Sequence, residues 1–448
     1  MSTDAAIPRS SAPGATFARR AIFRLLSEMP AGRLRLTTPS GEIAVFGKNS
    51  DATVSSAEPD AEIRIRDETF FSRCLWQGDI GFGEAYMEGL WDTPDLVGVI
   101  RWFLANAEHS PALSGSGGRF SPFNLLAVAN RLRHALRRNT RRMSRRNISE
   151  HYDLPPEFFA CFLEPGMTYS SGLWADGADN LEEAQHAKYE RLCGKLRLRP
   201  GHKVLEIGCG WGGFMEHAVR NHGCELTGAT LSGEQARYAE ARLRSRGRDD
   251  RARVVWSDYR QLSGQFDRIV SIEMIEAVGY RYLPVFFRRC ARLLKPDGLL
   301  GMQFITYPDS RYHRLRRGVD FIQKHIFPGS LLLSVNRVNA LMQESGFQLH
   351  EMRDMGSDYA RTLAEWRSRF EDNLASVREL GFDEAFIRKW RYYLCYCQAA
   401  FEARHISVVQ TVHTAPGNSE LDRSAERVEI LETSAETVAV GGGFSRDQ

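Results

Sequence analysis

The stretch from 204 to 214, which reads VLEIGCGWGGF, constrains the fold of this chain more than any other. Its first four residues form an apolar run with one acid, which is long enough for a buried strand. Gly208, Gly210 and Gly213 follow as a G-x-G-x-x-G turn, after which a helix can start. Glycines let the backbone approach a ligand closely and leave the N–H groups of the helix start free. The pattern predicts a nucleotide-like ligand, although a tight strand–helix turn without a ligand has the same pattern.

Length and composition exclude several classes of protein. A chain of 448 residues predicts two or three units, and its net charge of +3 requires any membrane or nucleic-acid affinity to come from local clusters. The eight cysteines lack paired C-x-x-C spacing, so we expect reduced thiols in a cytosolic protein and no metal site. The start of the sequence lacks a signal peptide's apolar core, and no apolar run reaches the roughly 18 residues of a membrane span.

Composition shifts divide the chain into five segments. In the small second segment, residues 33–46 alternate across a Pro-Ser-Gly turn and predict a hairpin, and helices are expected around 67–77 and 82–104. The long fourth segment alternates strand and helix patterns, which is the signature of a doubly wound sheet. We expect a disordered N-terminus at 1–16, a small α/β domain at 17–105, a linker and basic helix at 106–147, a large α/β domain at 148–412 and a flexible tail at 413–448.

The ends of the next strands indicate which ligand the glycine turn serves. In dinucleotide-binding folds an acid about 20 residues beyond the turn binds the ribose hydroxyls. Here the second expected strand ends in Thr230 without a carboxylate, which argues against NAD. Asp258 ends the third strand and can accept from an adenine amino group, an order that suits S-adenosylmethionine. Ser232 can also act simply as the cap of a helix over 233–245.

Several segments beyond the glycine turn carry a family resemblance. They read MTYSSGLW, GATLSGEQ, FDRIVSIEMIEAVG, FIQKHIFPG, DYARTLAEW and YYLCYCQAAFEARHI. Over about 148–412 the chain resembles the cyclopropane fatty acid synthases, and its N-terminal part resembles the small lipid-carrier-like domain of the phospholipid-acting members. The resemblance implies a Rossmann-like, S-adenosylmethionine-dependent methyltransferase domain. Such enzymes transfer a methyl group to a cis double bond of an acyl chain and then remove a proton to close a cyclopropane ring.

The resemblance also assigns residues to the methyl donor and to the carbocation. Aromatic faces stabilise a cation by about 0.5–2 kcal/mol each, and Tyr152, Tyr169, Trp174 and Tyr359 are candidates. Packing in the core is an equally good explanation for Trp174. The residues that the resemblance places around the donor are Tyr169, Ser170, Glu206, Gly208, Gly210, Gly212, Thr230, Leu231, Gln235, Asp258 and Tyr259.

The family uses a bound bicarbonate as its base, held by a Glu, a His, a Cys, a Tyr and backbone groups. Glu276 matches the Glu, Tyr359 the Tyr and Ile305 a backbone position. The sequence departs from the family at Ser171, in place of the Cys, and at Gln303, in place of the His. Both can donate hydrogen bonds to an anion, but Gln cannot relay a proton. The bicarbonate site can therefore persist in weaker form or be lost.

If the bicarbonate base is displaced, the sequence does not decide which product forms. After a hydride shift the cation could lose a different proton, which would yield a methyl- or methylene-branched chain. A lipid-binding protein that has lost catalysis is the third hypothesis. Cys397 aligns with a cysteine suspected of catalysis in the family, but no cation beside it lowers its pKa, and we favour a packing role.

Two basic runs suggest how the chain reaches its lipid. Eight arginines lie between Arg131 and Arg146, and RYHRLRR follows at 311–317. Such runs suit an anionic membrane surface, although a solvated helix face or nucleic-acid contact has the same pattern. We expect unsaturated phospholipid acyl chains as substrate, a cytoplasmic protein that associates peripherally with the inner face of the membrane, and no nucleic-acid partner. A homodimer and a partner reductase that completes the product are both left open.

Overall fold

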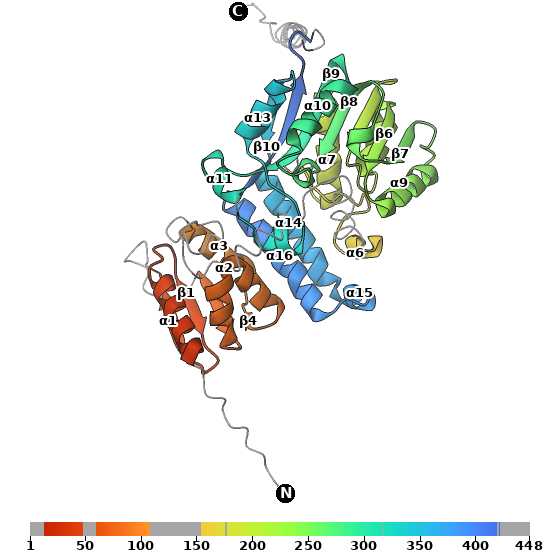
Figure 1. Ribbon diagram of the computed structural model, residues 1–448. Helices are drawn as coiled ribbons and strands as arrows, with labels where there is room; N and C mark the ends of the chain where they lie inside the picture. Colours follow the sequence, from red (N-terminus) through yellow and green to blue (C-terminus); the bar gives the residue numbers. More distant parts are fainter. Residues whose placement is uncertain are drawn as a thin grey trace, which may run out of the picture.

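The computed structural model of the protein describes residues 13–47, 60–107, 154–174, 177–316, 318–418 and 421. The basic run Arg131–Arg146 and Tyr152 lie outside these residues. Figure 1 shows a small N-terminal unit beside a larger unit that is built around a long twisted sheet. No helix in the described part of the chain is long and apolar enough to cross a membrane.

The small unit contains a four-stranded sheet of order β2-β1-β3-β4. The expected hairpin is confirmed: Leu34 pairs with Phe46 and Thr37 with Ile43 in antiparallel register. Burial alternates along β1 and β3, so one face of each strand is directed into the core. The strands are β1 (Leu34–Thr37), β2 (Ile43–Phe46), β3 (Ala61–Ile65) and β4 (Trp91–Asp92).

Three helices cover this sheet: α1 (Pro13–Ser27), α2 (Thr69–Met87) and α3 (Leu96–Asn106). The expected helix over 82–104 is wrong because the chain leaves helical geometry between α2 and α3. Gly89 adopts a φ of 73°, and β4 follows it. Asp95 then starts α3 by accepting a hydrogen bond from the Gly98 N–H, as an N-cap does. The apolar residues that suggested one helix belong to three elements.

The large unit contains a seven-stranded sheet of order β10-β11-β9-β8-β5-β6-β7. The five strands β5 to β9 are parallel, whereas β11 runs antiparallel to its neighbours β9 and β10. The sheet confirms the expected doubly wound architecture. Its strands are β5 (Lys203–Ile207), β6 (Glu225–Thr230), β7 (Ala252–Trp256), β8 (Phe266–Ile272), β9 (Leu294–Thr306), β10 (Gln348–Asp354) and β11 (Ser407–Thr414).

Helices flank the sheet, and central strands such as β5 are buried on both faces, whereas the edge strand β10 is largely exposed. Val204 packs into the cluster under α7 and α8, while its neighbour Leu205 packs into the opposite cluster under α10 and α13. The helices are α6 (Pro156–Ala160), α7 (Leu181–Lys195), α8 (Gly213–His222), α9 (Gly233–Ser245), α10 (Leu283–Leu293), α11 (Tyr312–Leu315), α12 (Phe321–His325), α13 (Val335–Glu344), α14 (Gly356–Asp372), α15 (Leu374–Glu379) and α16 (Glu384–Glu402), with 3-10 turns η2 (Tyr259–Gln261), η3 (Ile275–Ala277) and η4 (Asp309–Arg311).

The strand order places a crevice at the carboxyl end of β5. The strand that follows β5 in sequence, β6, lies on one side of it, and β8 lies on the other. From β5 the chain proceeds outward through β6 to β7 and then returns to β8 on the other side of β5, which makes this the switch point where ligands bind in open α/β sheets. The glycine turn follows β5 directly, so the fold places it in the crevice.

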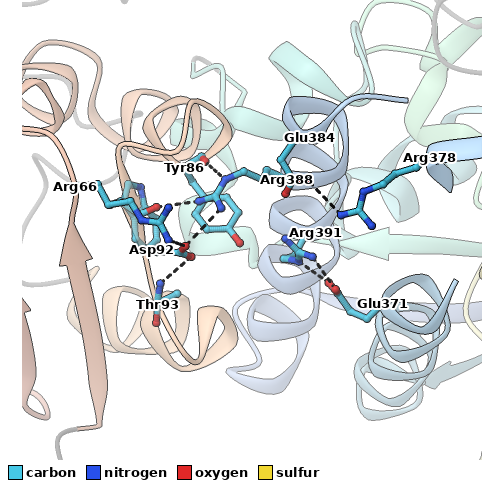
Figure 2. Close-up of polar contacts among 10 residues, drawn as sticks. Arg66, Tyr86, Asp92, Thr93, Glu371, Arg378, Glu384, Arg388 and Arg391 are labelled. Atoms are coloured by element: carbon cyan, nitrogen blue, oxygen red, sulfur yellow. Dashed lines mark hydrogen bonds and ion pairs between the residues drawn. The ribbon is translucent and has the colours of Figure 1, made fainter. Parts of the chain in front are cut away.

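The two units share a continuous core across α16. This helix packs against α2 and α3, and one apolar cluster runs from the small sheet to α14 and α16. Arg388 of α16 donates hydrogen bonds to the carbonyl oxygens of Tyr86 (2.5 Å) and Trp91 (2.9 Å) of the small unit. Figure 2 shows this guanidinium between Tyr86 and Asp92. At the other boundary, β11 continues through Thr414, two residues past the expected end of the large domain.

Candidate active site

The glycine turn adopts backbone conformations that only glycine accommodates well. Gly208, Gly210 and Gly212 have φ values of 90°, 50° and 85°. A Cβ at Gly208 would lie 2.5 Å from Met274 Cγ, so the turn is packed against the end of β8. Gly212 is the N-cap residue of α8 and offers no side chain to the first N–H groups of the helix. The turn therefore has the open, close-approach geometry that an anionic or nucleotide ligand needs.

The end of β6 leads into a well-capped helix. Ser232 Oγ accepts the Gln235 N–H at 3.2 Å, which confirms the helix cap expected for α9. Thr230 Oγ1 donates to Gln235 Oε1 at 2.8 Å. The Leu231 carbonyl accepts from the Trp256 indole at 2.9 Å. These bonds fix the loop between β6 and α9 beside the glycine turn, where a ribose would lie in folds of this type.

Asp258 follows β7 and is almost fully buried. Its carboxylate accepts hydrogen bonds from the Arg260 side chain, at 2.8 Å for Nε and 2.6 Å for Nη2. The Arg260 guanidinium also lies over the rings of Tyr259 and Tyr282, 5.4 and 5.3 Å from their centroids. Arginine therefore orients the acid that the sequence assigned to adenine, and a carboxylate retains lone pairs for a further donor.

Tyr169 and Ser170 lie on the loop before α7. The Tyr169 hydroxyl is 2.8 Å from the Tyr393 hydroxyl, and Ser170 Oγ accepts from Lys188 Nζ at 2.7 Å. Lys188 is fully buried, and burial lowers its pKa to about 8 although Glu273, Glu164 and Glu206 favour its charged form. Lys188 is thus a buried basic group surrounded by three carboxyl groups that favour its charged form.

Glu206, the acid within β5, is buried and lies next to the glycine turn. Its Oε2 atom has no hydrogen-bond partner among the described residues. Burial raises its pKa to about 8, and the Lys188 charge opposes this shift. An unsatisfied buried carboxyl oxygen is a strong acceptor for a ligand hydroxyl or ammonium group. With the glycine turn, it gives the site a fit for a methyl donor that carries an amino acid and a ribose.

Glu273 lies at the centre of the site, and sequence reasoning missed it. Its Oε1 atom accepts hydrogen bonds from the Ser171 N–H at 2.9 Å and from Gln303 Nε2 at 2.7 Å. Its Oε2 atom accepts the Tyr359 hydroxyl at 2.6 Å. Thus Ser171, Gln303 and Tyr359, which the family resemblance assigns to an anion site, all donate to one carboxylate of the chain itself.

The backbone directs Glu273 to this position. Its φ of 48° lies in the left-handed region, which non-glycine residues seldom adopt and which often marks functional positions. Its N–H donates to the Gln303 carbonyl at 2.7 Å, which ties the corner after β8 to β9. Burial raises the pKa of Glu273, while the three donors and the Lys188 charge lower it. The sequence could have revealed Glu273 through two features: an acid stands at the end of this strand, and the chain departs from the family at Ser171 and Gln303.

The two departures differ in what they contribute. The Ser171 main-chain N–H binds Glu273, whereas its hydroxyl donates to the Gly172 carbonyl at 2.9 Å and does not bind the acid. Gln303 is fully buried on β9, and its Oε1 atom accepts from Gln410 of the adjacent strand at 3.0 Å. The amide of Gln303 is therefore held with its NH₂ group toward Glu273.

Glu276 is the second carboxyl group of the site and lies in η3. Its Oε1 atom accepts the Ile305 N–H at 2.6 Å, which joins the two positions that the resemblance had assigned to the anion site. Its Oε2 atom is buried and has no partner among the described residues. Burial first, and then the charge of Glu273, raise the pKa of Glu276 to about 8. At neutral pH these effects favour the protonated form of Glu276, beside the hydrogen-bonded carboxyl group of Glu273.

The remaining candidates lie around this centre. The Tyr359 ring packs against Phe401 at a tilt of 34°, with ring centroids 4.5 Å apart. Trp174 donates its indole N–H to Thr362 at 3.0 Å and carries Arg361 over its ring, which places it in the core packing. Cys397 of α16 lies close enough to affect the titration of Tyr359, and burial raises the pKa of its thiol. The described surroundings of Cys397 therefore favour the thiol over the thiolate.

Comparison with known proteins identifies the architecture. The model of the family "Mycolic acid cyclopropane synthetase" matches residues 139–411. The tuberculostearic acid methyltransferase UfaA1 of Mycobacterium tuberculosis is 34% identical over 91% of this chain and 93% of its own length. The cyclopropane-fatty-acyl-phospholipid synthase of Escherichia coli is 37% identical over 79% of this chain and 87% of its own.

A solved structure agrees with these matches. The mycolic acid cyclopropane synthase CmaA1, complexed with SAH and CTAB, superimposes with a TM-score of 0.56 and 30% identity, covering 60% of this chain and 97% of that one. The seven-stranded sheet with its glycine turn is thus the fold of S-adenosylmethionine-dependent methyltransferases. The chain is such a methyltransferase and belongs to the mycolic acid cyclopropane synthetase family.

Proposed function

We propose that this enzyme transfers a methyl group from S-adenosylmethionine to the cis double bond of an unsaturated phospholipid acyl chain, with Glu273 as the base that completes the reaction. The observation that carries the proposal is the set of hydrogen bonds to Glu273 from Ser171, Gln303 and Tyr359. These donors are positions at which the family resemblance implies bicarbonate. A carboxylate of the chain accepts from them here, so the reaction needs no exogenous anion.

The chain would hold the donor between the glycine turn and the ends of β6 and β7. Close backbone approach at Gly208 and Gly212, the unsatisfied Glu206 Oε2 atom and the capped loop at Thr230 support this placement. When bound there, S-adenosylmethionine supplies an electrophilic methyl group. Asp258, oriented by Arg260, would accept from the adenine amino group.

The acyl chain would receive the methyl group at one alkene carbon, which leaves a cation on the neighbouring carbon. Tyr169 and Tyr359 present aromatic rings in this region, and each face stabilises a cation by about 0.5–2 kcal/mol. Glu273 Oε1 or Oε2 would then take one proton from the transferred methyl group. Glu276 beside it is uncharged when protonated, so it does not act as a second base toward the cation.

The base alone does not select the product. Loss of a methyl proton directly from the first cation closes a cyclopropane ring. After a 1,2-hydride shift places the cation on the methylated carbon, loss of a proton from the same methyl group gives a methylene branch. Glu273 can serve both routes because both protons leave the same carbon, and the ratio depends on whether deprotonation or the hydride shift is faster.

The cyclopropane is the product that we propose first. The methylene branch is the second candidate, and two observations favour it: the replacement of a small anion by a tethered side chain, and the nearly full-length match to a tuberculostearic acid methyltransferase. A partner reductase would be needed to convert the methylene branch to a methyl branch, because that step adds two electrons and two protons.

Access to phospholipid would follow from the basic run after β9. His313 and Arg314 of α11 are exposed, and Arg316 lies over the Tyr280 ring at 4.3 Å. We propose that this surface contacts anionic headgroups at the cytoplasmic face of the membrane. Pelleting with vesicles that contain or lack phosphatidylglycerol tests the idea, and equal binding to neutral vesicles would contradict it.

The decisive experiment replaces Glu273 by glycine, which removes the carboxylate and makes room for a small anion. In bicarbonate-free buffer we expect Glu273→Gly to lose turnover and to regain it on addition of bicarbonate or formate, while the wild type responds to neither. Glu371→Gln, in an ion pair with Arg391 on the helices α14 and α16, is the matched control and should keep wild-type turnover.

Lipid analysis with double-bond localisation identifies the product in the same assays. Wild-type turnover by both Glu273→Gly and Glu273→Gln without an added anion would refute the role of Glu273. Binding of S-adenosylmethionine by the wild type without formation of any lipid product would support the alternative of a lipid-binding protein.

A further inference from the structure

The helices α7 and α8 bring three metal-ligating side chains together on the side of the sheet away from α10 and α13. Cys193, His217 and His222 each direct one ligand atom into a common space, and these atoms all lie within 4.8 Å of one another. Cys193 is fully buried and His217 is 92% buried, while His222 is partly exposed. Elements separated in sequence thus place a thiol and two imidazoles at one point.

A fourth potential donor, Glu190, lies beside the two imidazoles of this group. Glu190 Oε2 lies 3.0 Å from His217 Nε2 and 3.2 Å from His222 Nε2, so one carboxylate oxygen is in reach of both rings. Glu190 precedes Cys193 by three residues on α7, a spacing that places both side chains on the same helix face. The Glu190 side chain is half exposed, so it can adjust to a bound ion.

We infer that Glu190, Cys193, His217 and His222 form a structural site for Zn²⁺. One sulfur, two imidazole nitrogens and one carboxylate oxygen are the donors that Zn²⁺ binds in tetrahedral sites. The set does not suit Ca²⁺ or Mg²⁺, which prefer oxygen ligands. The charges also balance: a thiolate and a carboxylate neutralise the two charges of the ion. With four protein ligands the site is closed, which is typical of structural zinc rather than catalytic zinc.

At this location a bound ion would fix the relative positions of two helices that border the donor site. His217 lies in the middle of α8 and His222 is its last residue, while the first turn of this helix follows the glycine turn at Gly212. The helix α7 carries Gln185 and Lys188, which bind the carbonyl and the hydroxyl of Ser170 at 2.8 and 2.7 Å. A metal that joins the two helices would hold both walls of the donor site in register.

Metal binding by the whole purified protein tests this inference without any use of activity. We expect about one zinc per chain by elemental analysis after dialysis against a metal-free buffer. After removal of zinc, Co²⁺ should produce the absorption bands of a tetrahedral ion with a thiolate-to-metal charge-transfer band. His222→Gln should weaken Zn²⁺ binding by more than the roughly 10- to 100-fold that loss of an outer-shell partner causes.

Matched variants separate this site from other cysteines and histidines. Cys290→Ser, at a buried cysteine of α10 under the opposite face of the sheet, should keep the charge-transfer band, and Cys193→Ser should lose it. Because Cys193→Ser could unfold the chain, circular dichroism must show that it retains the wild-type fold, and His222→Gln supplies the second, partly exposed test. A wild-type protein that binds no Zn²⁺, or a cobalt spectrum that is unchanged in folded His222→Gln, would overturn the inference.

Discussion

The Tyr359 hydroxyl donates a 2.6 Å hydrogen bond to Glu273 Oε2, across 86 residues of sequence. This bond joins α14 to the corner after β8 and gives the second carboxylate oxygen its donor. Burial raises the pKa of Tyr359 well above its usual value, and the neighbouring charge of Glu273 adds to this effect. Tyr359 therefore remains a hydrogen-bond donor at all working pH values, which is consistent with the proposed role of Glu273 as the base.

Removal of that donor should lower turnover and raise the pKa of Glu273. Tyr359→Phe takes away a bond to a charged group, an interaction that contributes about 1.5–3 kcal/mol. We expect turnover to fall roughly 10- to 150-fold. Because the bond lowers the pKa of Glu273, its loss raises that pKa and should move the acid limb of the kcat–pH profile to higher pH.

Tyr393→Phe is the control for this measurement. Its hydroxyl bonds the Tyr169 hydroxyl at 2.8 Å, whereas the hydrogen bonds to the Glu273 side chain in the described structure come from Ser171, Gln303 and Tyr359, so the acid limb should stay where it is in the wild type. An unchanged acid limb in Tyr359→Phe would contradict the assignment of Glu273 as the titrating base.

The glycine turn predicts a graded response to alanine. At Gly208 a Cβ would meet Met274 Cγ at 2.5 Å in a backbone with φ of 90°, whereas at Gly210 nothing lies within 4 Å and φ is 50°. Gly208→Ala should weaken S-adenosylmethionine binding by at least about tenfold, equivalent to 1.4 kcal/mol. Gly210→Ala should have the smaller effect, and calorimetric titration compares the two. The reverse order would show that Gly208 packing does not shape the donor site.

The contact between the two units should depend on one arginine. Arg388→Ala removes a charged donor from the carbonyl oxygens of Tyr86 and Trp91 and a cation from the Tyr86 ring, 3.9 Å from its centroid. The Tyr86 carbonyl still accepts the Gly89 N–H at 3.0 Å. A hydrogen bond from a charged group contributes about 1.5–3 kcal/mol, so the free energy of unfolding should fall by about 2–4 kcal/mol.

Arg378 offers a matched control in the same view (Figure 2). It pairs with Glu384 at 3.2 Å, and both side chains are more than half exposed. Such pairs contribute at most about 1 kcal/mol, so Arg378→Ala should leave the urea midpoint almost unchanged. A similar loss of stability in both variants would argue against a special role for the Arg388 contact.

Asp79 should give the fold a dependence on pH. This residue follows the non-helical Gly78 in α2, and burial and the charge of Asp320 raise its pKa to about 7. The unfolded chain ionises it near its usual pKa of about 3.9, so stability falls as pH rises from there to about 7 and is flat above. Asp79→Asn should abolish this slope and stabilise the protein at pH 7 and above, by at most about 4 kcal/mol.

Thermal denaturation between pH 4 and 8 measures this difference. Asp67→Asn is the control, because the Thr69 N–H lowers the pKa of Asp67 and gives its contribution the opposite sign. A wild-type curve that parallels Asp79→Asn over the whole range would show that Asp79 ionises in the folded state as it does in the unfolded chain.

Local patterns determined much of the large unit before any tertiary information. The apolar run at β5, the glycines after it and the Ser232 cap of α9 each act within a few residues, where sequence and backbone geometry are directly coupled. The expected helix over 82–104 was wrong because apolar spacing alone does not reveal a break within a helix. Gly89 and Asp95 interrupt the run there.

The amino-acid sequence by itself determined the family, the doubly wound sheet and the glycine turn after β5. Only the tertiary structure decided which side chains surround Glu273, because Ser171, Gln303 and Tyr359 meet it from elements far apart in the chain. A hydrogen bond depends on direction and distance within a few tenths of an ångström, and no periodicity records it. The same is true of Cys193 and His217, which share no motif and become neighbours only when α7 packs on α8.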